Sequence, residues 1–179
     1  AVDNSVDRAV GVVTHRVFEL LSRQVQLPDT ALLLRPAIEA NLRRHALRGS
    51  AFQSALARVE SLVTNALRCE HGRWLLSARS EAFSELPLCR LESGLLKSYV
   101  LDRTFVDTDT QCRWVIDYKT SAPRESESEH AFITREWQAY HAQLSTYREL
   151  VSARFSDKPE PVRTALYFPA IQVLTEGPS

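Results

Sequence analysis

The spacing of apolar residues changes once along this chain, and that change limits the folds available to it. In the first third, apolar residues recur at steps of three and four, as they do on one face of a helix. The clearest such series is Val10, Val13, Val17 and Leu21. From about Trp74 onward, β-branched and aromatic residues alternate with polar ones, as they do in strands. The sequence therefore predicts a helical N-terminal part followed by a sheet.

Three helical stretches are expected in the N-terminal part. They run from about Val6 to Gln24, from after Thr30 to Arg48, and from Ser50 to about Leu67. Gly49 is a candidate C-terminal stop for the second stretch, because glycine tolerates the left-handed backbone found there. Ser50 and Gln53 have the spacing of a capping box and would begin the third.

The rest of the chain predicts three strands, a helix and a fourth strand. The strands are expected at Ser84–Leu91, Leu95–Val106, Cys112–Tyr118 and Val162–Phe168, and the helix at Ala131–Phe155. Residues 107–110 have turn chemistry, so the second and third strands should form an antiparallel hairpin. This order predicts a mixed sheet flanked by helices. We expect one domain over residues 1–179, with a helical part at 1–70 and a sheet core at 74–179.

The composition excludes some classes of protein. Lys+Arg 22 balances Asp+Glu 22, so the whole chain has no net attraction for nucleic acid, and an autonomous DNA-binding module is disfavoured. A nuclease that receives its strand from an attached motor is still compatible with this balance. Three scattered cysteines favour a reducing compartment. No apolar run approaches the roughly 18 residues that span a membrane. The chain has no methionine, and we expect it to be part of a longer polypeptide.

An Asp-x-Lys pair, Asp117 and Lys119, follows three apolar residues at the end of the third predicted strand. Side chains alternate across a strand, so both should point to the same face, about 6.6 Å apart along it. A buried charge is costly unless it is paired or bound to a metal. The pair is therefore either a salt bridge at a strand end or part of an active site.

Asp102 lies on the predicted hairpin partner of Asp117. A turn at 107–110 would put Asp102 opposite a residue near 115 to 117, so that two acids and Lys119 converge on one patch. Such a cluster can hold Mg²⁺, which prefers oxygen ligands. A bound metal lowers the pKa of its water and polarises a phosphate oxygen, and a lysine can orient that water or neutralise developing charge. These three residues are the predicted catalytic centre.

Asp102 followed by Asp117-x-Lys119 on the next strand resembles the PD-(D/E)xK nuclease superfamily. The strings Ser98–Asp107 and Arg113–Ser121 look like the C-terminal nuclease domain of RecB/AddA-type helicase–nucleases. The resemblance covers nearly the whole chain. It implies an α/β, restriction-endonuclease-like fold and an (exo)deoxyribonuclease that depends on Mg (or Mn).

The resemblance also implies a set of metal ligands. In that group an N-terminal helix carries G-x-x-x-H, and Gly11 and His15 stand in that place. The implied ligands are His15, the carboxylates of Asp102 and Asp117, and the backbone carbonyl of Tyr118. Lys119 would assist the attacking water.

Two further matches are less specific. Glu85 stands where relatives have a glutamate on the preceding strand, but Glu81 lies close by and no spacing selects either. Gln143 and Tyr147 match a Q-x-x-x-Y signature and lie four apart, on one helix face. They are candidate substrate-binding residues that either contact the DNA backbone or hydrogen-bond to the sheet.

The partners that the resemblance implies are DNA, the helicase domains of a full-length protein, and a second helicase–nuclease subunit. The expected setting is double-strand-break repair and recombination in the bacterial cytoplasm, with no membrane. The alternative function is a catalytically inactive nuclease fold that serves as a scaffold or guides DNA in a helicase. That alternative fits less well, because His15, Asp102, Asp117 and Lys119 are all present, whereas a degenerate copy should have lost at least one.

Overall fold

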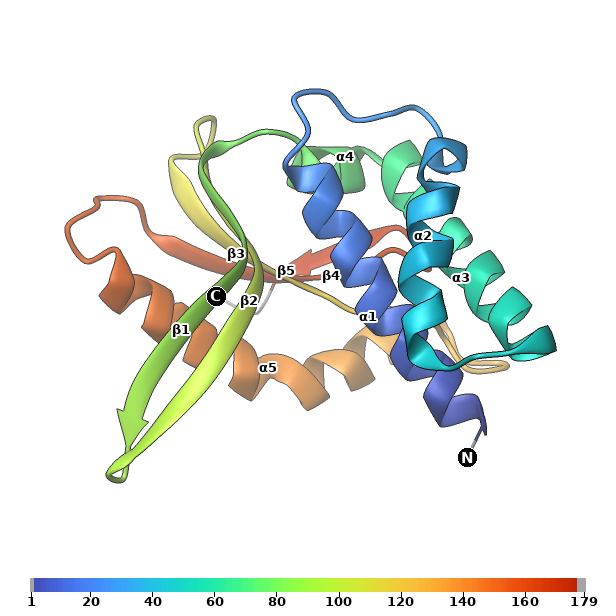
Figure 1. Cartoon of the computed structure of the whole chain (residues 1–179). Coiled ribbons are helices and arrows are strands. Elements are labelled where there is room, and N and C mark those ends of the chain that lie inside the picture. Colours follow the sequence, from blue (N-terminus) through green and yellow to red (C-terminus); the bar gives the residue numbers. More distant parts are fainter. Residues whose placement is uncertain (1, 177–179) are drawn as a thin grey trace. The chain divides into compact units, whose positions relative to one another are not determined.

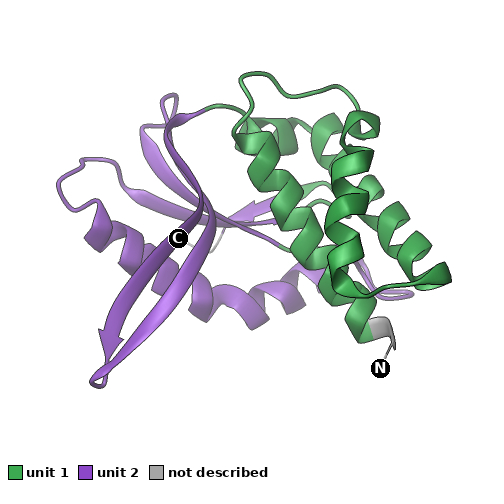
Figure 2. Cartoon of the chain, viewed as in Figure 1, with its two compact units in different colours: residues 1–78, 119–121, 168–173 green, residues 79–118, 122–167, 174–179 purple. Residues whose placement is uncertain are grey.

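The computed structural model of the chain describes residues 2–176, and within it the chain divides into two compact units (Figure 2). The first unit is residues 1–78, 119–121 and 168–173, and the second is residues 79–118, 122–167 and 174–179. Both units therefore contain segments that lie far apart in the sequence.

The first unit is built from helices, as the apolar spacing predicted. They are α1 (Val2–Ser22), α2 (Arg35–Leu42), α3 (Gly49–Arg68) and α4 (Glu70–Leu76), with short 3-10 turns at Ala31–Leu34 and Arg43–His45. Helix α1 packs against α3 (Figure 1). Their core is apolar and fully buried, with Val10, Phe18, Val59 and Val63 all 0% exposed. This burial is the stabilising contribution expected from the apolar stripes.

Three details of the N-terminal prediction were wrong. Gly49 does not end a helix: α2 ends at Leu42, and Gly49, with φ +55°, is the first residue of α3. Ser50 is not a cap, because the residue before α3 is Arg48 and no side chain caps that end. Trp74 belongs to α4, so the sheet begins at Ser80 and not near residue 74. The Gly49 and Ser50 signals were misread because α3 begins one residue earlier, at Gly49, which places Ser50 inside the helix.

A five-stranded sheet carries the predicted strands. Its strands are β1 (Ser80–Glu92), β2 (Leu95–Asp107), β3 (Cys112–Tyr118), β4 (Val162–Phe168) and β5 (Val173–Glu176). They lie in the order β1-β2-β3-β4-β5, with β1, β2 and β3 antiparallel and β4 parallel to β3. The predicted class, α/β with a mixed sheet flanked by helices and a helical N-terminal segment, is confirmed.

The predicted hairpin of β2 and β3 is present, with Asp107↔Cys112 as its first pair and Arg103↔Ile116 as its last. The Asp107 carboxylate fixes the turn, since its Oδ2 accepts from the backbone N–H (3.2 Å) and the hydroxyl (2.6 Å) of Thr110. Strand β5, four residues long, was not predicted, because so short a segment shows no clear alternation.

The β1–β2 hairpin extends beyond the part of the sheet that includes β3, because β3 pairs with β2 only from Arg103 onward (Figure 1). Its two-residue loop is Ser93-Gly94, with φ of 50° and 80°. Positive φ at both positions is the geometry of the tight turn that matches strand twist. This turn fixes the register of the hairpin from Glu92↔Leu95 as far as Phe83↔Thr104.

Helix α5 (Glu129–Arg154) contacts β1 and β3. Its N-terminus is capped by the Ser128 hydroxyl, which accepts from the backbone N–H of Ala131 (3.2 Å). Such a cap satisfies one of the N–H groups that have no partner within the helix. Its buried residues include Phe132, Leu144, Tyr147, Leu150 and Val151.

Across residues 2–176, the helices are either too short or too polar to cross a bilayer. The three cysteines, Cys69, Cys89 and Cys112, are free thiols.

Burial of Leu101, the residue before Asp102 on β2, should stabilise the fold beside the candidate site. Leu101 is fully buried, so Leu101→Ala should lower the free energy of unfolding by about 2–5 kcal/mol through lost burial and a cavity. Leu95→Ala is the matched control, because Leu95 lies on the same strand and is 69% exposed. Its cost should stay within about 0.5 kcal/mol. Urea denaturation measures both, and equal losses would contradict this account of the core.

Candidate active site

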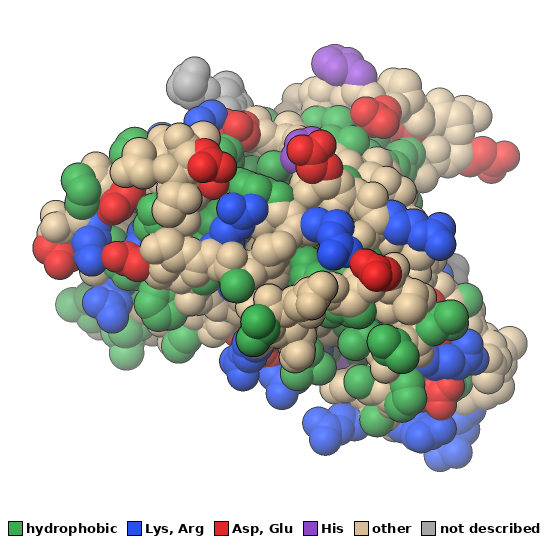
Figure 3. Space-filling view, turned by 90° about the horizontal axis from the view of Figure 1, so that it is seen from above, with side chains coloured by type: hydrophobic (Ala, Val, Ile, Leu, Met, Phe, Trp, Pro, Cys, Tyr) green, Lys and Arg blue, Asp and Glu red, His purple; other side chains and the backbone are tan. Residues whose placement is uncertain are grey.

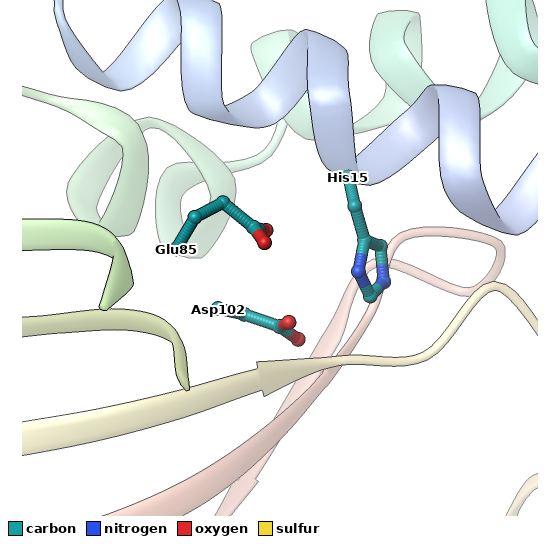
Figure 4. A group of neighbouring side chains, drawn as sticks. All are labelled: His15, Glu85 and Asp102. Atoms are coloured by element: carbon teal, nitrogen blue, oxygen red, sulfur yellow. The ribbon is translucent and has the colours of Figure 1, made fainter. Parts of the chain in front are cut away.

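The carboxylates of Glu85 and Asp102 are brought together by the register of β1 and β2. The pairs on either side are Ser84↔Arg103 and Leu86↔Leu101, so Glu85 stands opposite Asp102. Oxygens of the two side chains lie within 4.8 Å of each other. Figure 4 shows both carboxylates pointing in the same direction from their neighbouring strands.

Glu85 is held in an unusual backbone conformation for a residue in a strand. Its φ is 52°, and Glu81, earlier in β1, has φ 45° near a shift of register between Ser80 and Phe83. A residue other than glycine pays of order 1–3 kcal/mol for this left-handed region. Such irregularities redirect side chains, and they are common beside functional sites.

Asp102 is fixed from the other side by β3. It is only 8% exposed, and its Oδ2 accepts a hydrogen bond of 2.6 Å from the backbone N–H of Tyr118. One step beyond the pair Arg103↔Ile116, Asp102 stands opposite Asp117. This confirms the prediction that Asp102 lies opposite a residue near 115 to 117. Asp117 is 4% exposed.

Three carboxylates therefore follow one another across three adjacent strands, at Glu85, Asp102 and Asp117. Asp117 does not belong to the group of ligand atoms within 4.8 Å of one another that includes Glu85 and Asp102. Like charges opposite each other on neighbouring strands are destabilising, and burial makes the charges more costly still. A bound cation removes both penalties.

The donor set fits a hard divalent cation. Carboxylate oxygens are the ligands that Mg²⁺ prefers, and Mn²⁺ accepts the same donors. The carboxylates of Glu85 and Asp102 lie close enough to share one ion, and no thiol takes part in the group.

Of the other predicted metal-site and catalytic residues, Tyr118 and Lys119 lie at the end of β3 and His15 lies on α1. Lys119 is half-buried and comes directly after the last residue of β3, Tyr118. His15 is half-buried on α1, in the first unit. Burial raises the pKa of the Tyr118 phenol, so this side chain is neutral at physiological pH.

The structure separates the two glutamates that the sequence left unresolved. Glu81 forms ion pairs with Arg113 (2.5 Å) and Lys158 (2.9 Å), and its pKa is lowered, most strongly by its hydrogen bond to Lys158. Glu85 lies beside Asp102 instead. The sequence alone does not assign Glu85 to the site. The Ser93-Gly94 turn was the missed signal, because a two-residue loop there pairs residue 85 with residue 102.

Tyr147 reaches the sheet. Its side chain is 5% exposed, and its hydroxyl donates to the Val100 carbonyl (3.4 Å) while accepting from Gln143 Nε2 (2.8 Å). Its ring meets that of Tyr99 edge-on at 6.3 Å. The Tyr147 phenol therefore holds β2 two residues before Asp102. Of the two roles considered for Gln143 and Tyr147, contact with the DNA backbone or a hydrogen bond to the sheet, this contact is the second.

The charge on the protein surface is mixed. On the face in Figure 3, Lys and Arg side chains lie among Asp and Glu side chains and apolar ones. This agrees with the balanced composition and offers little long-range attraction for a polyanion.

The model of the PD-(D/E)XK nuclease superfamily matches residues 2–177 of this chain. The chain belongs to the PD-(D/E)XK nuclease superfamily. No curated protein matches it.

For this PD-(D/E)XK protein, nuclease activity is the expected activity. That the superfamily motif falls on Asp102, Asp117 and Lys119 stays a prediction. In the structure, Asp102 and Asp117 lie on the neighbouring strands β2 and β3.

Tyr147 should show its role in an alkaline titration. Burial, followed by the charges of Asp117 and Asp102, raises its pKa to about 12. The folded protein therefore holds this phenol proton more tightly than the unfolded chain, whose tyrosines titrate near 10. The resulting stability is present below about pH 10 and is lost as the pH rises through about 12.

At pH 7, Tyr147→Phe should cost about 0.5–1.5 kcal/mol from the lost hydrogen bonds. The difference in free energy of unfolding between wild type and Tyr147→Phe should become smaller above pH 10. Tyr140→Phe, on the same helix, is the control, and guanidinium denaturation at both pH values is the measurement. A difference in free energy of unfolding that grows above pH 10 would contradict the raised pKa of Tyr147.

Proposed function

We propose that this chain is the nuclease domain of a helicase–nuclease that hydrolyses phosphodiester bonds of DNA in double-strand-break repair and recombination. The observation that carries the proposal is the succession of Glu85, Asp102 and Asp117 across three adjacent strands, with Lys119 directly after the end of β3. The family model extends over both compact units, which supports the prediction that residues 1–179 act as one nuclease domain.

The proposed cofactor is Mg²⁺ or Mn²⁺. Asp102 would be the central ligand, with Asp117, the Tyr118 carbonyl and His15 as the others, and the structure adds Glu85 to this set. When bound, the metal supplies a water of lowered pKa and polarises a phosphate oxygen.

The protein side chains have separate tasks in this proposal. The Tyr118 N–H holds Asp102 in one orientation through its 2.6 Å hydrogen bond. Asp102 and Asp117 would hold the cation near the reacting phosphate. Lys119 provides a fixed positive charge that orients the attacking water or stabilises the charge developing on the phosphate. Tyr147 and Gln143 position β2, and in this proposal they affect substrate only through that strand.

Metal binding should be visible as stability. A ligand that binds only the folded state raises the melting temperature, and Mn²⁺ should therefore raise it in wild type. Asp102→Asn should abolish the rise, because an amide binds the cation weakly, yet its oxygen still accepts from the Tyr118 N–H. Asp109→Asn is the control, since Asp109 is exposed in the β2–β3 turn. A rise of equal size in all three proteins would place the metal elsewhere.

Catalysis should depend on Lys119 without loss of the metal. Lys119→Ala should keep the Mn²⁺-induced rise in melting temperature and lose about a hundredfold to a thousandfold in single-turnover cleavage of linear DNA. Excess EDTA should abolish cleavage by wild type. If wild type binds Mn²⁺ and DNA but does not cleave, the alternative function, a catalytically inactive scaffold or DNA-guiding module, replaces the nuclease.

A further inference from the structure

Strand β1 has one residue more than its partner β2 between the start of the strand and the candidate active site. Ser80 pairs with Val106. The next pair is Phe83 with Thr104, so β1 has advanced by three residues and β2 by two. Such an insertion is a β-bulge, in which two residues of one strand stand opposite one residue of the other. Beyond it the register stays constant as far as the hairpin turn.

The place of this extra residue decides which side chain of β1 stands opposite Asp102. With the extra residue where it is, Glu85 takes that place. If the register of Ser80 continued and the extra residue lay nearer the hairpin turn, Ser84 would take it instead. A shift of one residue also turns the side chains of a strand to the opposite face. The bulge therefore has to stay at the start of β1 for Glu85 and Asp102 to meet.

Arg113 holds the bulge through both the backbone and the side chain of Glu81. Its guanidinium donates to the Glu81 carboxylate (2.5 Å) and to the Glu81 carbonyl (3.2 Å). Glu81 has a φ of 45°, which is uncommon for a residue with a Cβ. Arg113 lies on β3, two strands away, and its side chain is only 1% exposed. Bonds from a buried, charged donor therefore fix a backbone conformation that is otherwise unfavourable.

An aromatic ring and a second ion pair complete the contacts of the bulge. The Arg113 guanidinium lies over the ring of Phe155, 3.8 Å from its centroid. Phe83, where regular pairing resumes, packs on the same ring, with 5.9 Å between the centroids. Lys158 forms the second ion pair with Glu81 (2.9 Å). Both ends of the bulge are therefore held, by β3 and by the chain just after α5.

We infer that Arg113 and Glu81 are positioning residues for the candidate active site. By fixing the bulge at the start of β1, they place Glu85, and not Ser84, opposite Asp102. Neither residue is a ligand in the candidate site, and both act through the register of β1. The consequence for metal binding rests on the proposed function, whereas the placement of Glu85 does not.

The first test measures the coupling between Glu85 and Asp102, and it needs neither metal nor cleavage. A double-mutant cycle with Glu85→Gln and Asp102→Asn, followed by urea denaturation in EDTA at neutral pH, isolates the interaction of the two side chains. Wild type should show a repulsive coupling, because like charges stand opposite each other on paired strands. Arg113→Met keeps an apolar chain on Phe155 but loses both bonds to Glu81. In that background most of the coupling should be lost.

The second test is the affinity for Mn²⁺, measured by isothermal titration calorimetry. Arg113→Met should bind Mn²⁺ about tenfold more weakly than wild type, the size of loss expected when a residue that orients a metal ligand is removed. Arg113→Met/Glu81→Gly should recover both the affinity and the coupling, because glycine readily adopts positive φ. Glu149→Gln is the matched control: it removes an ion pair of the same strand, with Arg90, and should leave both measurements unchanged.

An Arg113→Met protein that folds with the coupling and the Mn²⁺ affinity of wild type would overturn the inference and leave Arg113 a role in stability alone. A loss of both that Glu81→Gly does not restore would also overturn it, since the loss would then not act through the bulge. If Arg113→Met does not fold, Glu81→Gln weakens the ion pair and keeps the carbonyl bond. It should reduce the coupling, and an unchanged coupling there would count against the inference.

The two tests also separate the inference from the proposed function. Wild type that does not bind Mn²⁺ would reject the proposed metal site alone, because the coupling in EDTA still tests the placement of Glu85. Mn²⁺ binding by wild type with the same coupling in every background would reject the positioning role alone.

Discussion

Glu85 and Asp102 stand opposite each other on two paired strands, and the other contacts of the candidate site in the second unit hold this pair in place. Two carboxylates with oxygens within 4.8 Å repel each other, and the fold keeps them there. The register of the hairpin, the backbone N–H of Tyr118 and the contact with α5 all hold the pair in place. In the proposed function, a bound cation offsets this repulsion.

The residues around this pair have two kinds of role: some position the strands, and in the proposed function others act on the phosphate. Tyr147 is buried and reaches a carbonyl of β2, so its hydroxyl positions a strand. Lys119 follows β3 directly and is half-buried. In the proposed function it is the preorganised charge at the reacting phosphate.

Much of this could be predicted from residues near one another in the sequence. The alternation in Cys112–Tyr118 gave β3 with both ends correct. The turn chemistry of 107–110 gave the antiparallel partner of that strand, and with it the place of Asp102 opposite Asp117. Errors came where a local signal had two meanings, as at Gly49, whose positive φ serves the start of α3 and not the end of α2.

The sequence by itself determined which residues can do chemistry and which strand carries them, because strand alternation and tight turns are local properties. It did not choose between Glu81 and Glu85, since both are acids on one strand. Tertiary structure decided that question: Arg113 and Lys158 bind Glu81, and the hairpin register puts Glu85 beside Asp102. Long-range pairing also gave Tyr147 its partner on β2. Contacts between distant segments depend on how the elements pack, and no short stretch of residues encodes that packing.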